Sequence, residues 1–360
     1  MVSIKKVVDF LINLKKEDVI INIFHNDADG VCSCVLMNRF LKRKICKEAD
    51  SVIAQPMPPA KNLLQRIRLS LPSKIIFLDL SIDQDKSIIK KLEQDCEILI
   101  IDHHQISNNL NSKKTVHYNP LFENPSIYQS GSYLTYKICS TVLNDSDWDK
   151  KNLWLAIIGI IGDYYIRDSL DIIKKAEEYY SDIIKNNDQE ALHNSLFGQV
   201  SDMISAAKAC KISCEEIVNI INSMETVHEI NKQQKLVDSY KKVQEDIERI
   251  KIDIKSNIDS NKNVLFYEKK SKYNLRSPIA TIMSNDYPKK LIVVWEDIKN
   301  KIKISARNQN KNINVAKTLK SVIKDFKYAS AGGHEAAAGA SIRKQDWEEF
   351  KERLEELVNK

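Results

Sequence analysis

Apolar segments of strand length that end abruptly in charged residues constrain the fold of this 360-residue chain more than any other feature. Three such segments lead into acidic and histidine residues: 19–24 into His25-Asn26-Asp27-Ala28-Asp29-Gly30, 75–78 into Asp79, and 97–101 into Asp102-His103-His104. Continuous apolar runs are typical of parallel strands buried on both faces. The carboxyl ends of such strands share one crevice, where ligands bind. The sequence therefore predicts a functional site at that edge of a sheet.

The order of the predicted elements indicates an α/β fold. Up to residue 118 strands alternate with helices of roughly 10–15 residues, a rhythm that predicts a parallel sheet with helices on both faces. Residues 131–224 are predicted to be a wholly helical insert, and 229–257 one long charged helix. Strand and helix patterns resume after residue 261, with a glycine-rich turn expected at residues 331–334. We expect three parts: a larger domain at 1–228, a helical connector at 229–260, and a smaller α/β domain at 261–360.

Composition sets limits on the class of protein. The 55 basic and 49 acidic residues leave a formal charge of +6, which is compatible with a polyanionic partner but is equally typical of a lysine-rich solvated surface. Seven cysteines without any CxxC pair indicate buried free thiols in a reducing compartment. The amino-terminal segment lacks the apolar core of a signal peptide, and no apolar run approaches the ~20 residues of a spanning helix. We expect a cytoplasmic protein with no membrane partner.

The residue types at the strand ends favour a metal site. His25, Asp27 and Asp29 alternate, so in extended backbone their side chains would point the same way. Asp79 could bridge two ions, and His103 and Asp163 could complete the second set of ligands. Mixed Asp and His ligands without thiolates favour Mn²⁺ or Mg²⁺. Two such ions, roughly 3.5–4 Å apart, suit in-line attack on phosphorus.

Each motif taken alone also has an ordinary structural explanation. An Asp-rich turn is often a solvated turn or a helix cap. A DHH sequence can be a strand end with satisfied polar groups, and Asp163 can be a residue that ends a helix. The occurrence of four such motifs, in order and at element ends, favours the metal site.

Six motifs together resemble the DHH phosphoesterase superfamily. The segments FHNDADG (24–30), FLDLS (77–81), IDHHQ (101–105) and GIIGD (159–163) are similar to its four motifs. SARNQ (305–309) and SAGGHEAAAG (330–339) are similar to the arginine and glycine-histidine motifs of its DHH-associated carboxy-terminal domain. The resemblance covers nearly the whole chain.

The resemblance implies a role for each matching residue. His25 and Asp27 would hold the first of two Mn²⁺ (or Mg²⁺) ions, and Asp29, His103 and Asp163 the second, with Asp79 between them. Asp102 would orient an imidazole, and His104 would contact the scissile phosphate. Arg307, Gly332, Gly333 and His334 would bind a neighbouring phosphate, although a Gly-Gly bend and a surface arginine are each commonplace on their own.

Within the superfamily, the KISARN strand, the glycine-histidine ending and the helical insert are similar to archaeal RecJ-like nucleases. This similarity implies a metal-dependent exonuclease that hydrolyses single-stranded DNA or RNA from an end to nucleoside monophosphates. An oligoribonuclease or 3′-phosphoadenosine 5′-phosphate phosphatase, acting on very short substrates, is the second hypothesis. A replication-complex component that binds GINS is the third. Tyr128, Tyr133, Tyr164 and Tyr165 could stack bases, and Lys61, Arg66 and Arg68 could follow a phosphate backbone, although core packing and solvation are the more ordinary roles of such residues.

Overall fold

The structure is a computed structural model that describes residues 4–163, 166–184, 188–259, 261–310, 312–333 and 335–359. The chain divides into two compact units, Met1–Tyr240 and Lys241–Lys360. The functional domain limits at residues 228 and 261 stay a prediction. Among the described residues, no helix combines the length and apolar character needed to cross a membrane.

The amino-terminal unit contains a parallel sheet of five strands in the order β2-β1-β3-β4-β5. Its strands are β1 (Ile20–His25), β2 (Ser51–Gln55), β3 (Lys74–Leu78), β4 (Glu97–Ile101) and β5 (Thr115–Tyr118). The predicted parallel sheet is therefore confirmed. Phe24 pairs with Leu78, and Leu78 pairs with Ile101, so the three central strands end level with one another.

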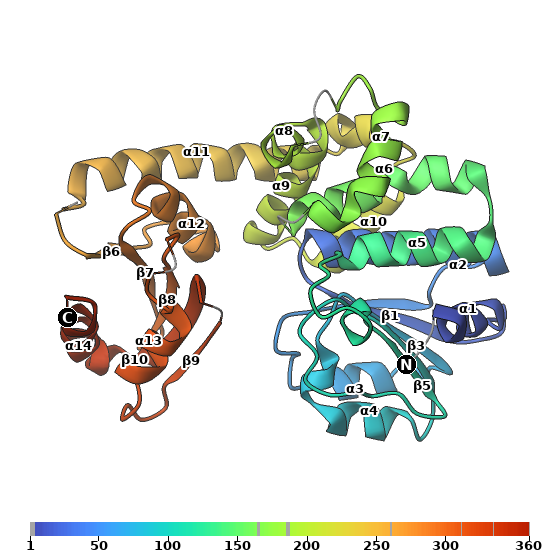
Figure 1. The fold of residues 1–360 in the computed structure, drawn as a ribbon, viewed down its shortest axis with the longest axis horizontal. Helices are drawn as coiled ribbons and strands as arrows, with labels where there is room; N and C mark the ends of the chain where they lie inside the picture. The colour runs from blue at the N-terminus through green and yellow to red at the C-terminus, as the bar shows by residue number, and fades with distance from the viewer. Residues whose placement is uncertain are drawn as a thin grey trace. The chain divides into compact units, whose positions relative to one another are not determined.

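Helices cover both faces of this sheet, as the sequence predicts (Figure 1). One face packs on α1 (Ile4–Ile12), α2 (Ala28–Ile45) and α5 (Gly131–Leu143), and the other on α3 (Leu63–Arg68) and α4 (Lys86–Leu92). Neighbouring residues of β1 point to opposite faces of the sheet. Phe24 packs in the apolar core with α1, α2 and α5, and Ile23 packs in the core with α3 and α4. Both side chains are fully buried.

The helical insert surrounds α6 (Ser146–Gly162), in which every residue from Asn152 to Ile161 is buried. A helix that is apolar on all sides must lie inside a bundle. Its companions are α7 (Leu170–Tyr179), α8 (Gln189–His193), α9 (Leu196–Ala209) and α10 (Cys214–Asn222). Short 3₁₀ turns occur at Ile82–Gln84, Pro120–Phe122, Arg167–Ser169, Val227–Lys232 and Lys344–Asp346. The long charged helix α11 spans Gln234–Asn257.

The carboxy-terminal unit has a second, mixed sheet of five strands in the order β6-β7-β8-β10-β9. Its elements are β6 (Val264–Glu268), α12 (Arg276–Asp286), β7 (Leu291–Ile298), β8 (Lys301–Arg307), α13 (Val315–Val322), β9 (Ser330–Gly333), β10 (Ala337–Arg343) and α14 (Trp347–Asn359). Only β6 and β7 are parallel. Residues 330–333 form the edge strand β9, so the expectation of a turn beginning at Ala331 is wrong. Antiparallel pairing of Gly332 with Gly339 keeps this segment extended.

Candidate metal centre

The carboxyl edge of the first sheet brings three of the predicted residues together. His25 ends β1, Asp79 follows β3 directly, and Asp102 follows β4 directly. Main-chain hydrogen bonds continue the sheet past the strand ends, from Asp79 N to Ile101 O at 2.9 Å and from Asp102 N to Tyr118 O at 3.1 Å. The level strand ends therefore place these side chains next to one another, as expected for neighbouring parallel strands.

Asp79 lies at the centre of this group and is 1% exposed. Its Oδ1 is 2.9 Å from His103 Nε2, and its Oδ2 is 3.7 Å from His25 Nδ1. Neither carboxylate oxygen has a hydrogen-bond partner of acceptable geometry among the described residues. Asp79 also has a φ of +55°, a left-handed conformation that is unusual for a residue other than glycine. The backbone thus holds a buried carboxylate beside the imidazoles of His103 and His25.

Asp27 and Asp29 enter the site from the start of α2. Asp27 is the N-cap residue; it accepts a hydrogen bond from Gly30 N at 3.0 Å and lies 2.6 Å from His25 Nδ1. Asp29 is in the first helical turn, so the expectation that His25, Asp27 and Asp29 alternate along extended backbone is wrong. The helix begins at Ala28 because Asp27 caps it. Asp29 nevertheless reaches the site, as a residue of the helix.

The carboxylate of Asp29 is held by the amino-terminal end of α5. Its Oδ2 accepts from Gly131 N at 2.5 Å and its Oδ1 from Ser132 N at 2.9 Å. Free N–H groups at a helix start favour an anion. Sequence reasoning missed Gly131 and Ser132 as site residues, because nothing in their local sequence indicates a contact with a residue about one hundred positions earlier.

Two glycines permit this close approach. A Cβ on Gly131 would lie 2.6 Å from Asp79 Cβ, and a Cβ on Gly159 would lie 2.4 Å from Asp29 Oδ1. Any side chain at either position would displace a carboxylate of the site. Gly159 belongs to the GIIGD motif, and the sequence could have indicated its role only through that resemblance.

Asp163 completes the group from the end of α6. It is the C-cap residue of that helix, and its Oδ2 is 3.4 Å from His103 Nε2. The hydroxyl of Tyr128 donates to the same oxygen at 3.4 Å, and the Tyr128 ring lies 5.4 Å from the His103 ring, edge to face. Tyr128 is therefore part of the site's surroundings. The sequence suggested base stacking or core packing for it.

His104 lies beside the group and is held in place from two sides. Its Nδ1 is 2.7 Å from Asp102 Oδ1, and its main-chain carbonyl accepts from Asn119 Nδ2 at 2.9 Å. Asp102 and Asn119 are each 2% exposed, whereas the His104 side chain is 32% exposed. Asp102 therefore contacts His104, which is more accessible than the neighbouring imidazole of His103.

These residues form three overlapping sets that could each hold a metal ion, with ligand atoms within 4.8 Å of one another. The sets are His25, Asp27 and Asp79; Asp29, His103 and Asp163; and Asp79, His103 and His104. The first two match the two sets predicted for the two ions, with Asp79 close to both. Both ring nitrogens of His103 and both carboxylate oxygens of Asp79 are buried without hydrogen-bond partners among the described residues. Buried carboxylate and imidazole groups of this kind are suitable oxygen and nitrogen ligands for divalent cations.

The electrostatics of the centre also fit bound cations. Burial would lower the pKa of His25, but the carboxylates of Asp27 and Asp79 outweigh it and raise that pKa to about 10. Burial and the neighbouring charge of Asp79 raise the pKa of Asp29 to about 7. Burial and the charge of Asp29 likewise raise the pKa of Asp163. Protons therefore balance the crowded carboxylates when no cation does, and a metal ion would take over that function.

The residues predicted to bind a phosphate lie in the carboxy-terminal unit. Arg307 ends β8, and Gly332 and Gly333 lie on β9, on either side of β10. With Ser277 and Ser305 they line a pocket of about 230 Å³. Arg307 donates to Ser277 Oγ at 3.3 Å. Predicted residue His334 lies outside the described residues, as do Tyr164 and Tyr165.

Gly333, but not Gly332, is required by the backbone of this pocket. A Cβ on Gly332 would meet nothing within 4 Å, so the strand leaves open space there. Gly333 has a φ of +142°, and a Cβ on it would lie 2.5 Å from Ala338 Cα.

In the amino-terminal unit, Arg66 pairs with Glu215 at 3.1 Å. This ion pair competes with the role in following a phosphate backbone that the sequence suggested for Arg66.

Comparison with known families identifies two domains in this sequence. Residues 19–160 match the model of the DHH family, N-terminal domain, and residues 245–360 match the DHHA1 domain. The chain belongs to the DHH family of phosphoesterases and carries a DHHA1 domain. None of the curated proteins matches its sequence.

Solved structures share the two-unit fold. RecJ from Thermus thermophilus in complex with Mn²⁺ has a TM-score of 0.76 at 15% identity; the match covers 99% of this chain and 54% of that one. This chain thus spans about half the length of that protein. An exonuclease RecJ bound to manganese has a TM-score of 0.74 at 15% identity, covering 99% and 94%. The pGpG-specific phosphodiesterase PggH from Vibrio cholerae has a TM-score of 0.51 at 11% identity, covering 94% and 98%. At these identities the likeness concerns the fold.

Proposed function

We propose that this protein is a Mn²⁺- or Mg²⁺-dependent phosphodiesterase that hydrolyses single-stranded DNA or RNA from an end and releases nucleoside monophosphates. The observation that carries the proposal is the convergence of histidine and aspartate side chains around the buried carboxylate of Asp79. Family membership makes phosphoester hydrolysis the reaction class. The RecJ structures with the same fold support nucleic acid as the substrate.

Each residue of the centre has a proposed task. His25 and Asp27 would hold one ion and Asp29, His103 and Asp163 the other, with Asp79 shared. When bound, two divalent cations would supply a nucleophilic water at neutral pH and would neutralise charge on the phosphate. His104, which is partly exposed and oriented by Asp102, would donate a hydrogen bond to a substrate oxygen.

The remaining side chains of the site position these groups. The amides of Gly131 and Ser132 fix the Asp29 carboxylate, and Tyr128 orients that of Asp163. Hydrogen-bonded carboxylates are fixed in orientation, which keeps a metal site in its productive geometry. In the carboxy-terminal unit, Arg307 would bind a substrate phosphate, with the backbone at Gly332 and Gly333 open to it. His334 would share that task.

The test is hydrolysis of end-labelled single-stranded DNA and RNA ladders with Mn²⁺ or Mg²⁺. Asp79→Asn should abolish turnover while the fold survives, because asparagine has nearly the same size and also tolerates positive φ. Asp95→Asn, at an exposed position away from the centre, should behave as the parent protein. Undiminished Mn²⁺-dependent hydrolysis by the Asp79→Asn variant would falsify the proposed site.

A second candidate function is hydrolysis of very short substrates, such as dinucleotides, short RNA or 3′-phosphoadenosine 5′-phosphate. The observation that favours it is the match to PggH, a phosphodiesterase described as specific for pGpG, along 98% of that chain. A substrate-length series separates the two functions. Rates that peak at two or three nucleotides support the second, and rates that are maintained on longer strands support the exonuclease.

Binding to a GINS complex, which the resemblance to archaeal RecJ-like proteins implies, remains a prediction about partners. It does not compete with catalysis, because all six candidate metal ligands are present. A pull-down with purified GINS, run beside the nuclease assay, tests it.

A further inference from the structure

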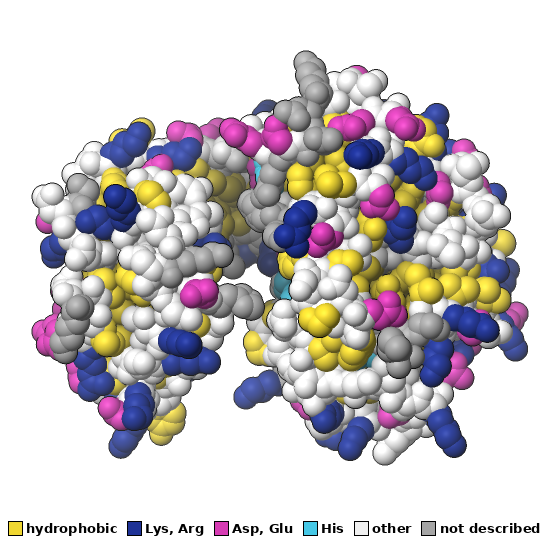
Figure 2. Space-filling model, in the orientation of Figure 1, with side chains coloured by type: hydrophobic (Ala, Val, Ile, Leu, Met, Phe, Trp, Pro, Cys, Tyr) yellow, Lys and Arg dark blue, Asp and Glu magenta, His cyan; other side chains and the backbone are white. Residues whose placement is uncertain are grey.

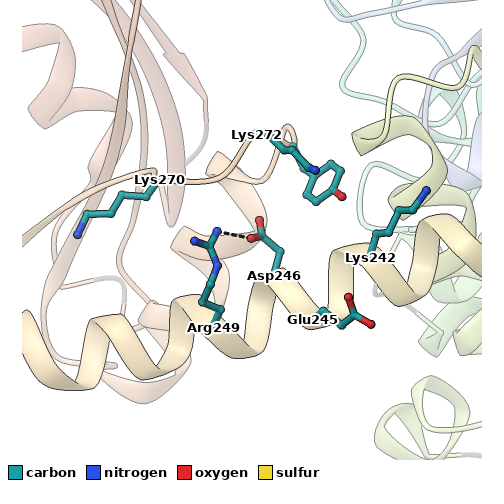
Figure 3. A pocket seen from close by; sticks show the side chains of 7 residues that line it. Lys242, Glu245, Asp246, Arg249, Lys270 and Lys272 are labelled. Atoms are coloured by element: carbon teal, nitrogen blue, oxygen red, sulfur yellow. Dashed lines mark hydrogen bonds and ion pairs between the residues drawn. The ribbon is translucent and has the colours of Figure 1, made fainter.

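A second hollow in the carboxy-terminal unit lies away from the residues discussed so far. It has a volume of about 450 Å³ and lies between α11 and the loop that follows β6 (Figure 3). We call it the α11 groove. It is lined by Lys242, Glu245, Asp246, Arg249, Lys270, Lys272 and Tyr273. None of these residues lines the pocket that contains Arg307.

The loop wall of the α11 groove is held by a buried cation. Lys269, whose side chain is 4% exposed, donates from Nζ to the carbonyl of Tyr273 at 2.8 Å and pairs with Glu296 at 2.5 Å. The amide of Tyr273 donates to Ser271 Oγ at 2.9 Å. Because a buried ammonium needs such partners, the conformation of residues 269–273 is set by the fold and not by solvent. The groove is therefore a preformed feature.

The helix wall presents charged residues along one face. Lys242, Asp246 and Arg249 are spaced at i, i+4 and i+7, so they lie on the same side of α11 and span roughly 10 Å along its axis. Asp246 is engaged by Arg249, as Figure 3 shows. On the loop side, Lys270 pairs with Asp253 at 3.4 Å. Lys242 and Lys272 form no ion pair with any carboxylate among the described residues.

The groove thus combines four cations with two carboxylates. Arg249 pairs with Asp246 and Lys270 with Asp253, so Lys242 and Lys272 are the groove cations without a carboxylate partner among the described residues. Lys242 of the helix and Lys270 of the loop lie toward opposite ends of the groove, with Arg249 and Lys272 between them (Figure 3). Elsewhere, Lys and Arg are interspersed with Asp and Glu over the face seen in Figure 2. A local run of cations is the feature that a polyanion would recognise.

We propose that the α11 groove binds the sugar-phosphate backbone of a single-stranded nucleic acid, with Tyr273 stacking on a base. This inference rests on the proposed function, because it assigns a second contact region to the same substrate. The half-buried ring of Tyr273 already has the Lys272 ammonium 5.3 Å from its centre. An aromatic ring among cations is the arrangement that binds single strands without reading their sequence. The elongated distribution of cations favours a strand over a lone phosphate group.

The experiment measures binding without turnover. The full chain carrying Asp79→Asn is titrated with a fluorescent twelve-nucleotide single strand, DNA or RNA, and its anisotropy is followed at several salt concentrations. The groove variant is Lys242→Gln with Lys272→Gln. The matched control is Lys255→Gln with Lys262→Gln, which removes the same charge from exposed lysines of the same unit outside the groove.

The groove variant should bind the strand roughly tenfold more weakly, and its log-log salt slope should be smaller by about 1.4, as expected for two lost phosphate contacts. The control should change affinity by less than about twofold. Tyr273→Leu should also weaken binding by roughly tenfold, whereas Tyr273→Phe should keep the affinity because its ring still stacks. These results together would support the proposal.

Three results would overturn it. Equal losses in the groove variant and the control would mean that only bulk charge matters. Loss of AMP binding in the groove variant with unchanged strand binding would assign the groove to a mononucleotide. Loss of binding to a glutamate-rich peptide with unchanged strand binding would assign it to a protein. Because binding is measured in an inactive background, a parent protein that hydrolyses no strand would refute the proposed function and leave the groove result intact.

Discussion

The main-chain N–H of Gly131 donates a 2.5 Å hydrogen bond to Oδ2 of Asp29, so the start of α5 holds a carboxylate that comes from the start of α2. The two residues are about one hundred positions apart. Gly159 of α6 also lies close to this carboxylate, because a Cβ on it would be 2.4 Å from Asp29 Oδ1. The candidate metal centre thus depends on the packing of three helices as well as on the level strand ends of the sheet.

A methyl group at Gly159 should disturb this packing. In Gly159→Ala the new Cβ would lie 2.1 Å from Ser132 Oγ and 2.4 Å from Asp29 Oδ1. Both side chains are buried, so they cannot move aside without disturbing the packing around them. Overpacking of this kind costs about 1–3 kcal/mol of the free energy of unfolding. Urea unfolding measures that loss, and isothermal titration with Mn²⁺ should show weaker binding. Gly339→Ala, whose Cβ would have its nearest neighbour at 3.4 Å, is the control and should leave both quantities nearly unchanged.

Metal binding should stabilise the protein through Asp79. A ligand that binds only the folded state at 100 times its Kd adds about 2.7 kcal/mol to the free energy of unfolding. Mn²⁺ should therefore raise the Tm of the parent protein and of Asp95→Asn, and EDTA should reverse the change. Asp79→Asn should show little or none of this rise. An equal Mn²⁺-dependent rise in Asp79→Asn would mean that the ion binds elsewhere.

Tyr128 should tune the affinity for an ion held by Asp163. Tyr128→Phe removes the hydroxyl that contacts Asp163 Oδ2 but keeps the ring against His103. Loss of a group that orients a ligand typically weakens metal binding by roughly tenfold or more. Mn²⁺ titration measures this change. Tyr133→Phe removes a comparable hydroxyl contact, to Asp171 at 3.4 Å, and should leave Mn²⁺ affinity as it is.

His117 should make stability fall at mildly acidic pH. Burial lowers the pKa of this imidazole, whose Nδ1 accepts a hydrogen bond from Leu110 N at 3.4 Å, so the folded protein favours the neutral ring. The unfolded chain takes up the proton near the ordinary value of 6.5. The contribution of His117 to stability is therefore fully present above pH 6.5 and is lost as the pH falls below it.

The measurement compares urea unfolding of the parent protein and of His117→Gln, both in EDTA, between pH 7.5 and pH 5. Glutamine can accept the same hydrogen bond but does not titrate, so the stability advantage of the parent protein should shrink as the pH falls. A difference that stays constant with pH would show that His117 titrates alike in the folded and unfolded states.

Local sequence patterns were sufficient to predict several parts of this protein. Apolar runs that end in charge predicted the parallel strands, and level strand ends then brought His25, Asp79 and Asp102 to one edge. This inference succeeds because the side chains that follow neighbouring parallel strands have few alternative positions. The motifs also indicated which acids and histidines to group, and the structure brings those six together.

Contacts between distant segments follow from the folding of the whole chain, and no local pattern predicted them. Asp29 enters from a helix and not from extended backbone, Gly131 and Ser132 hold it, and Tyr128 contacts Asp163. Residues 330–333 are a strand because β10 pairs with them, although their glycines by themselves indicate a turn. Local sequence encodes the conformational preferences of a segment, whereas hydrogen bonds and close packing between segments are set by the partners that the whole fold brings within reach.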